Sequence, residues 1–298
     1  MDSLTSLKLV DIWPVSTRQL LDFFESAPHL RNVDLRFETP TSSDQTGRLV
    51  SLADLKFMHI NSGSSSVLLD HLLIPVGADL SAEVEFPSSD PPRFLDNLRN
   101  LPHFTTIESS GGPNPYMWFS GPNGRVELDL ITSQGDEISL VLEYLAQFDT
   151  SGTERLKIDF DLDDSGYPPC RVLLPMKDLH TLTLENCKST QNFIHLLDPG
   201  KNPSGGVICP KLEEIVIDHV GKLGIKDLVG MAAARESRGA KLKAIWILST
   251  WGLEYTQFEL SALEEHVSRV ELMESLKAMR HRVHGEGDMG QPVTLALI

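Results

Sequence analysis

The sequence predicts a mixed α/β fold in which short parallel strands alternate with helices, and three observations support it. Residues 179–187 read L-x-x-L-x-L-x-x-C, a pattern whose leucines point into a core. Related L-x-x-L-x-L segments recur along the chain, about 25 to 33 residues apart where they are adjacent. Apolar residues at helical spacing separate several of these segments. Together they indicate a leucine-rich-repeat solenoid, a curved horseshoe with a parallel inner sheet and outer helices.

The predicted strand segments share the spacing of the leucine pattern. They start at Leu4, Leu30, Leu55, Phe104, Leu179, Leu212, Leu242 and Val267. Weaker strands are predicted within residues 81–86, 126–130 and 156–160 from alternating apolar positions. The segment at Val267 also fits a helix that includes Leu263, and the strand is favoured because it keeps the repeat phase.

Helices are predicted between the strands from apolar periodicity and from stop signals. The first follows an N-cap at Ser16 or Thr17 and stops at Pro28, and another spans residues 225–237 before Gly239. The remaining predicted helices cover residues 67–74, 94–98, 138–148, 193–197 and 273–283. Residues 109–115 are predicted as a turn. The predicted solenoid covers residues 1–283, and residues 284–298 form a C-terminal tail.

The charge of the chain limits its partners. The sequence holds 42 acidic and 26 basic residues, a formal net charge of −16. Such a chain repels phosphate backbones and anionic lipid surfaces, so we expect neither nucleic-acid nor membrane binding. No apolar run reaches the roughly 18 residues of a membrane span, and the first residues lack the features of a signal peptide.

The three cysteines, Cys170, Cys187 and Cys209, form no C-x-x-C pair, and their odd number does not indicate a disulfide framework. We therefore expect reduced thiols and a cytoplasmic or nuclear location. Cys187 occupies the ninth position of its repeat, which predicts a buried structural thiol rather than a nucleophile.

Motifs that carry catalysis are missing from the sequence. It contains no G-x-S-x-G, Walker loop or H-E-x-x-H. His281 and His284 are spaced H-x-x-H near Glu286 and Asp288, but a solvated tail explains them better than a metal site. The acidic run from Asp159 to Asp164 lacks the spacing of a calcium loop. We expect a non-enzymatic protein without cofactor or metal.

The predicted binding surface is the concave face of the sheet, because residues between the core leucines point outward there. They include Asp34, His59, Glu108, Lys157, Thr183, Glu214, Val216, Trp246 and Glu271. An outward tryptophan is a hot-spot candidate, and carboxylates lie near it. The predicted partner-binding residues are Glu185, Glu214, Asp218, Trp246 and Glu271, and their charge suits a protein partner with a basic patch. The alternative is that the flanking loop with Trp251 covers Trp246.

Three segments go beyond the generic repeat: residues 26–33 (SAPHLRNV), 209–215 (CPKLEEI) and 233–243 (AARESRGAKLK). They resemble the fungal F-box/leucine-rich-repeat-like proteins, and the likeness covers about residues 1 to 275. In that family an N-terminal F-box binds the Skp-type adaptor of an SCF ubiquitin ligase, and the repeats are thought to present substrate.

The resemblance implies a protein–protein interaction module like the substrate-recognition repeats of an F-box protein. The F-box itself has no counterpart here, since nothing before Leu4 fits its Leu-Pro-x-Glu-type helix. We therefore expect binding of a Skp-type adaptor only if an F-box is supplied upstream. The alternative is a free-standing leucine-rich-repeat scaffold with no ubiquitin link.

Overall fold

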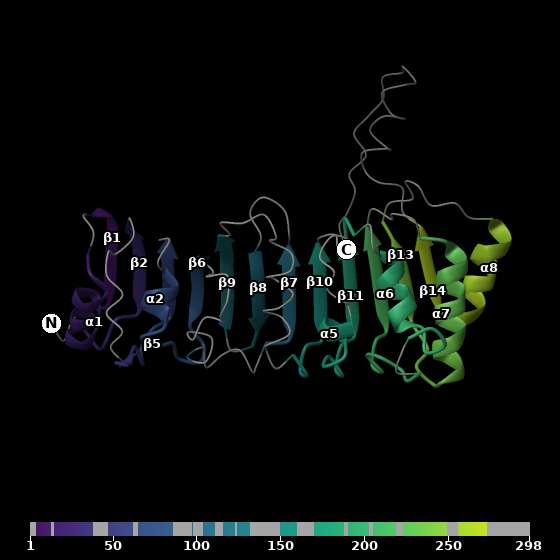
Figure 1. The fold of residues 1–298 in the computed structure, drawn as a ribbon, viewed down its shortest axis with the longest axis horizontal. Coiled ribbons are helices and arrows are strands. Elements are labelled where there is room, and N and C mark those ends of the chain that lie inside the picture. Colours follow the sequence, from purple (N-terminus) through teal and green to yellow (C-terminus); the bar gives the residue numbers. More distant parts are fainter. Residues whose placement is uncertain are drawn as a thin grey trace, which may run out of the picture.

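The computed structural model of the chain is a mixed α/β protein built on one large, open and mostly parallel sheet (Figure 1). It describes residues 4–12, 15–37, 47–61, 65–85, 97, 104–110, 116–122, 124–131, 150–159, 170–187, 190–202, 205–218, 223–248 and 256–272. Twelve strands follow the order β1-β2-β4-β6-β9-β8-β7-β10-β11-β12-β13-β14, and β3 and β5 form a separate pair. Most strands therefore lie beside their predecessor in the chain.

The strands of the large sheet are short. In chain order they are β1 (Ser6–Ile12), β2 (Asn32–Phe37), β4 (Phe57–Asn61), β6 (Asp79–Glu85), β7 (Thr106–Ser110), β8 (Tyr116–Gly121), β9 (Gly124–Ile131), β10 (Arg155–Asp159), β11 (Thr181–Glu185), β12 (Glu214–Asp218), β13 (Ala244–Ile247) and β14 (Arg269–Leu272). The small pair consists of β3 (Val50–Ser51) and β5 (Leu72–Leu73).

The described helices connect or follow these strands. They are α1 (Thr17–Ser26), α2 (Ser65–Leu69), α5 (Cys170–Leu173), α6 (Thr190–Leu197), α7 (Ile225–Ser237) and α8 (Gln257–His266). Ser16 caps α1 through a reciprocal capping box with Gln19, as its position predicts. Gly239, at φ +77°, takes the left-handed conformation after α7 that favours glycine, which ends that helix.

One hydrophobic core lies between the sheet and the helices. Along β10, β11 and β12 every second residue is buried, and the residues between them are half-buried except Arg155, which is exposed. The buried strand residues join the buried faces of α1, α6 and α7 in a single cluster. The helices therefore cover one face of the sheet, here called the inner face, and the alternate strand residues lie on the opposite, outward face.

All eight segments predicted from the leucine pattern hold strands of the large sheet, each beginning two residues after the predicted start. The reason is visible in the repeat at 179, where Leu179, Leu182 and Leu184 are completely buried. Leu179 lies in the turn before β11, and Leu182 and Leu184 are the inner-face residues of the strand itself. The weaker predictions at 81–86, 126–130 and 156–160 are also confirmed, as β6, β9 and β10.

The prediction of a parallel sheet throughout is wrong at its centre. Strand β8, which lies between β9 and β7 in Figure 1, is antiparallel to both. Two consecutive hairpins therefore insert β9, β8 and β7 between β6 and β10. A two-residue connection joins Gly121 to Gly124, which pair with one another, and Gly124 has φ +126°. Residues 109 and 110, predicted as a turn, belong to β7.

Two helix predictions also need correction. The apolar run 67–74 is divided, because α2 ends at Leu69 and Leu72 and Leu73 form β5, which pairs with β3. Helix α8 was not predicted, although Thr256 and Glu259 form a capping box at its start. The strand at Val267 is confirmed as β14. The predicted helices at 138–148 and 273–283, nearly all of that at 94–98, and the tail 284–298 lie outside the described residues.

Candidate partner-binding face

Strand register aligns one side chain from each strand in a row across the outward face of the sheet. We call this set the central row: Lys8, Asp34, His59, Ser81, Glu127, Trp118, Glu108, Lys157, Thr183, Val216, Trp246 and Glu271. The inner-face residues described between the two edge strands are buried, those of the edge strands β1 and β14 are partly buried, and most of the central row is half-buried. A partner that lies across the strands would therefore meet this row first.

The five predicted partner-binding residues all lie on the outward face. Trp246 pairs with Glu271 in the central row. Glu185 and Asp218 pair two residues further along their strands. Glu214 pairs with Thr181 and lies on the other side of the row. The structure thus brings Trp246 together with Glu271, and Glu185 with Asp218.

The ring of Trp246 is covered by Arg269, from the neighbouring strand β14. The guanidinium carbon lies 4.5 Å from the ring centroid, within cation–π distance. The Nε of Arg269 also donates to Glu271 Oε1 at 2.6 Å. Trp251, proposed from the sequence as part of a covering loop, lies outside the described residues. Trp246 is therefore a half-buried ring that an ion pair holds in place.

Glu185 is held by Lys157, at 3.0 Å between Oε2 and Nζ. Burial favours the neutral amine of Lys157, but the hydrogen bond to Glu185 and nearby carboxylates outweigh it and raise its pKa. This ion pair lies at the centre of the outward face, between β10 and β11. It leaves the predicted cluster less negative than its carboxylates alone suggest.

Sequence reasoning missed the aromatic part of this face, because it comes from the unpredicted strand β8. Tyr116 and Trp118 both lie on its outward side, half-buried, while Met117 and Phe119 fill the core. The run Met117-Trp118-Phe119 is apolar throughout, so it shows no alternation that a sequence pattern could detect. The Gly-Pro-Asn-Gly segment after it was the available hairpin signal.

Tyr116 lies in an acidic environment. Burial, the largest effect, raises the pKa of its phenol, and Glu108, Asp159 and Glu185 raise it further against the opposing charge of Lys157. The phenol therefore stays protonated at neutral pH and offers a hydrogen-bond donor on the outward face.

Cys187 is a structural thiol, as its repeat position predicts. It is completely buried, and its Sγ donates to the backbone oxygens of Glu185 and Ile158 at 3.2 and 3.6 Å. Burial raises the pKa of the Cys209 thiol to about 12. Both groups are therefore poor nucleophiles at neutral pH.

The described residues contain no group of three or more potential metal ligands. Of the acidic run 159–164, only Asp159 is described, and it accepts a hydrogen bond from Asn186 at 2.7 Å. The histidines at 281 and 284 fall in the part of the chain that is not described.

Polar clusters on the helical side of the sheet tie neighbouring units together. Asp227, in the first turn of α7, accepts hydrogen bonds from His195 and Lys201 at 3.0 and 2.9 Å. Burial acts to raise the pKa of Asp227, but the bonds from Lys201 and His195 outweigh it and lower the pKa. Gln191 donates to its other carboxylate oxygen. These hydrogen bonds join α6 and the segment after it to α7.

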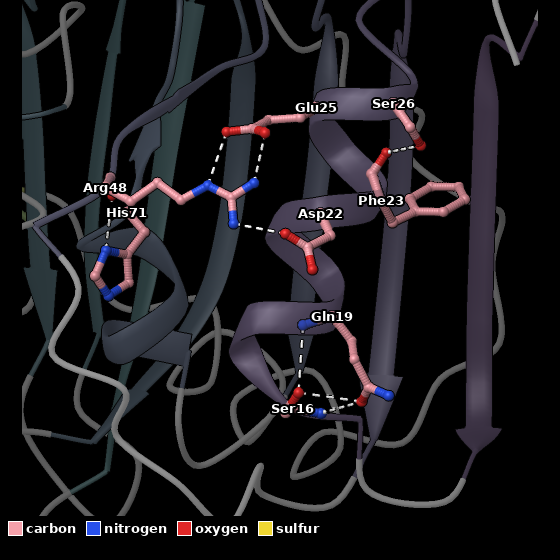
Figure 2. Close-up of polar contacts among 8 residues, drawn as sticks. All are labelled: Ser16, Gln19, Asp22, Phe23, Glu25, Ser26, Arg48 and His71. Carbon is pink, nitrogen blue, oxygen red and sulfur yellow. Dashed lines mark hydrogen bonds and ion pairs between the residues drawn. The ribbon is translucent and has the colours of Figure 1, made fainter.

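Arg48 makes a similar connection at the N-terminal end (Figure 2). Its guanidinium binds Glu25 through two nitrogens, at 2.8 and 2.5 Å, and Asp22 at 2.6 Å, which ties it to α1. The Nδ1–H of His71 donates to the backbone oxygen of Arg48 at 2.9 Å. The cluster joins three chain segments, and its charges are paired.

A third connection is completely buried. Arg235 of α7 donates from Nη1 to Ile208 O at 2.8 Å and from Nη2 to Cys209 O at 2.9 Å. Cys209 has φ +49°, so the backbone turns sharply where the guanidinium binds it. Burial lowers the pKa of Arg235 to about 10, which leaves it charged at neutral pH. Its geometry is that of a structural brace.

Comparison with known proteins identifies no relative: no protein-family profile and no curated protein matches this chain. Among the described residues, no helix has the length and apolar character needed to cross a lipid bilayer.

Proposed function

We propose that this chain is a non-enzymatic protein–protein interaction module, a leucine-rich-repeat solenoid that binds its partner on the outward face of the sheet. One observation carries the proposal. The described helices pack on the inner face, while the outward face presents half-buried tryptophans and carboxylates on adjacent strands. Half-buried aromatic side chains in such a setting are typical of binding hot spots.

The solenoid part of the proposal is supported by the spacing of the strands. Hydrogen bonds between side chains of neighbouring units join residues about one repeat apart, as for His29 with Asp54 and Asp159 with Asn186, which are 25 and 27 residues apart. A stack of such units buries its leucines against its neighbours. The antiparallel β8 is an insertion into this stack.

The resemblance to F-box/leucine-rich-repeat-like proteins suggests the kind of partner. On the hypothesis that this resemblance suggests, the chain corresponds to the substrate-recognition repeats of an SCF ubiquitin ligase. The second candidate is a free-standing scaffold with no ubiquitin link. Both candidates share the same binding face, and an adaptor-binding experiment separates them.

Trp246→Ala should weaken partner binding by about 2 kcal/mol, the scale of an interface hot spot. Its ring is half-buried and fixed by Arg269 and Glu271, so little entropy is lost when a partner packs on it. The measurement is quantitative capture from cell extract on immobilised protein, followed by titration of each captured protein.

Phe258→Ala serves as the matched control, because Phe258 is an exposed aromatic residue of helix α8 and lies away from the outward face of the sheet. Circular dichroism verifies that both variants fold. Equal capture by the wild type and a folded Trp246→Ala protein would rule out this part of the face as the binding site.

Residues 1–298 should not bind a Skp-type adaptor. An F-box presents its own apolar helical surface to the adaptor, whereas α1 and α7 bury their apolar residues in the core of the sheet. Isothermal titration with purified adaptor tests this expectation. Micromolar or tighter binding would contradict it, and fusion of an F-box upstream provides the positive control.

All three cysteines should titrate as free thiols in denatured protein that was prepared without a reductant. Cys187 and Cys209 are buried and form no disulfide, so the native protein should react slowly and the unfolded protein completely. Thiol counting in both states gives the answer. Recovery of a single thiol would reveal a disulfide and argue against the cytoplasmic or nuclear location that we propose.

A further inference from the structure

The same arrangement of three side chains occurs twice on the outward face. On β9, Arg125-Val126-Glu127 lies beside β8, and Glu127 pairs with Trp118. On β14, Arg269-Val270-Glu271 lies beside β13, and Glu271 pairs with Trp246. We call these sets the central triad (Trp118, Arg125 and Glu127) and the C-terminal triad (Trp246, Arg269 and Glu271).

The geometry of the two triads agrees. The guanidinium carbon lies 5.1 Å from the ring centroid of Trp118 in the central triad and 4.5 Å from that of Trp246 in the C-terminal triad. In each, the arginine also forms an ion pair with the glutamate two residues later. One strand pair is antiparallel and the other parallel, so the repetition does not follow from local backbone geometry alone.

Each triad is a preorganised anchor for a partner. The arginine restrains the indole ring, and the glutamate neutralises the arginine, so a partner meets a fixed aromatic surface at low entropic cost. In the central triad the indole nitrogen of Trp118 is shielded from water and has no hydrogen-bond acceptor among the described residues.

The two anchors stand in one row at a fixed separation. Strands β7, β10, β11 and β12 lie between β8 and β13, so the tryptophans are five strand spacings apart. At about 4.8 Å per spacing this is roughly 24 Å, the length of about seven residues of extended chain. A single extended segment that crosses the strands can reach both rings.

The surface between the anchors is acidic. Lys157 is paired with Glu185, which leaves Asp159 and Glu108 as further carboxylates near it. In the described part of the chain, Glu108 takes part in no salt bridge. Basic side chains of a bound segment would find uncompensated charge here.

We propose that the two triads together bind one extended, basic segment of a partner protein, laid across strands β8 to β13. Apolar or cationic side chains about seven residues apart contact the two rings, and lysine or arginine residues between them face Glu108 and Asp159. This proposal rests on the proposed function and adds a second anchor and the chemistry of the occupant.

A phage-displayed library of random 12-residue peptides, selected on the immobilised chain, tests the proposal. Enriched peptides should carry net positive charge and apolar or cationic residues about seven positions apart. The best peptide should bind Trp118→Ala and Trp246→Ala about tenfold or more weakly than the wild type, and the double variant without measurable affinity. Its six-residue halves should each depend on only one tryptophan. Phe258→Ala, which removes an exposed aromatic side chain of helix α8, should bind like the wild type.

Several results would overturn the proposal: no enrichment, enrichment of acidic or neutral peptides, or equal binding by the double variant in its folded form. If Trp246→Ala weakens binding and Trp118→Ala does not, the two-anchor proposal fails while the proposed function stands. If neither substitution affects the peptides or the partners captured from extract, both fail.

Discussion

Replacement of Arg235 by alanine should lower the free energy of unfolding by about 3–5 kcal/mol. The substitution leaves a cavity in the core and removes the donors that bind Ile208 O and Cys209 O. Ile208 O then loses its donor from Arg235, which costs about 1–3 kcal/mol for a buried carbonyl, whereas Cys209 O keeps the bond from Leu212 N–H at 3.0 Å. Chemical denaturation monitored by circular dichroism measures the loss.

Two further variants separate packing from hydrogen bonding. Arg235→Met restores most of the volume but no donor, so the loss that remains reports the hydrogen bonds of the guanidinium to Ile208 O and Cys209 O. Arg238→Ala is the matched control, because Arg238 also donates to a backbone oxygen, Gly205 O at 3.1 Å, but is exposed. It should cost about 1 kcal/mol or less. Equal losses for the two arginine-to-alanine variants would show that Arg235 is no buried brace.

Phe119→Ala should destabilise the protein by about 3–5 kcal/mol, whereas Trp118→Ala should cost about 1 kcal/mol. Phe119 is 1% exposed and packs on Phe104 at 5.9 Å between ring centroids. Trp118, its neighbour in β8, lies on the outward face under Arg125. Thermal and urea unfolding of the two variants compares the two faces of one strand.

The comparison also tests the register of the hairpin. A shift of β8 by one residue would exchange its two faces, so the larger loss would then follow the tryptophan. A greater loss for Trp118→Ala than for Phe119→Ala would therefore contradict the strand pairing described here.

The sequence predicts the position of most strands because the leucine pattern is local. Leu179, Leu182 and Leu184 need only their own spacing to identify an inner face, and the same holds at Leu212 and Leu242. Capping residues and glycine then set the ends of α1 and α7. These features depend on few residues, and the chain repeats them.

The central hairpins could not be predicted from that pattern. Which strand pairs with which is a matter of tertiary structure, and β6 is followed in space by β9 rather than by β7. The burial of Arg235 was not predicted, for a different reason. It follows Leu228 and Met231 on the buried stripe of α7, but a charged residue there reads as solvent-exposed.

The candidate site also divides into features that local sequence predicts and features that depend on contacts between strands. Alternation along the strands identified the outward side of Trp246 and its acidic neighbours correctly. It could not reveal that Arg269 covers the ring or that Lys157 neutralises Glu185, because these contacts join different strands. Both arginine–glutamate pairs are nevertheless visible as Arg-Val-Glu in the sequence, a signal that becomes meaningful once the strands are paired.

The inserted hairpins also govern the order in which the chain can fold. Contacts on their two sides join residues far apart in the sequence: Asp79 with Arg125 across 46 residues, and Ser109 with Lys157 across 48. Contacts between ordinary neighbours close shorter loops, such as the 25 residues from His29 to Asp54. Longer loops cost more entropy to close, and non-local contacts form late. The parallel strands β1, β2, β4 and β6 can therefore nucleate independently of the parallel strands β10 to β14. The hairpin strands β7, β8 and β9 join the two groups afterwards into one continuous sheet.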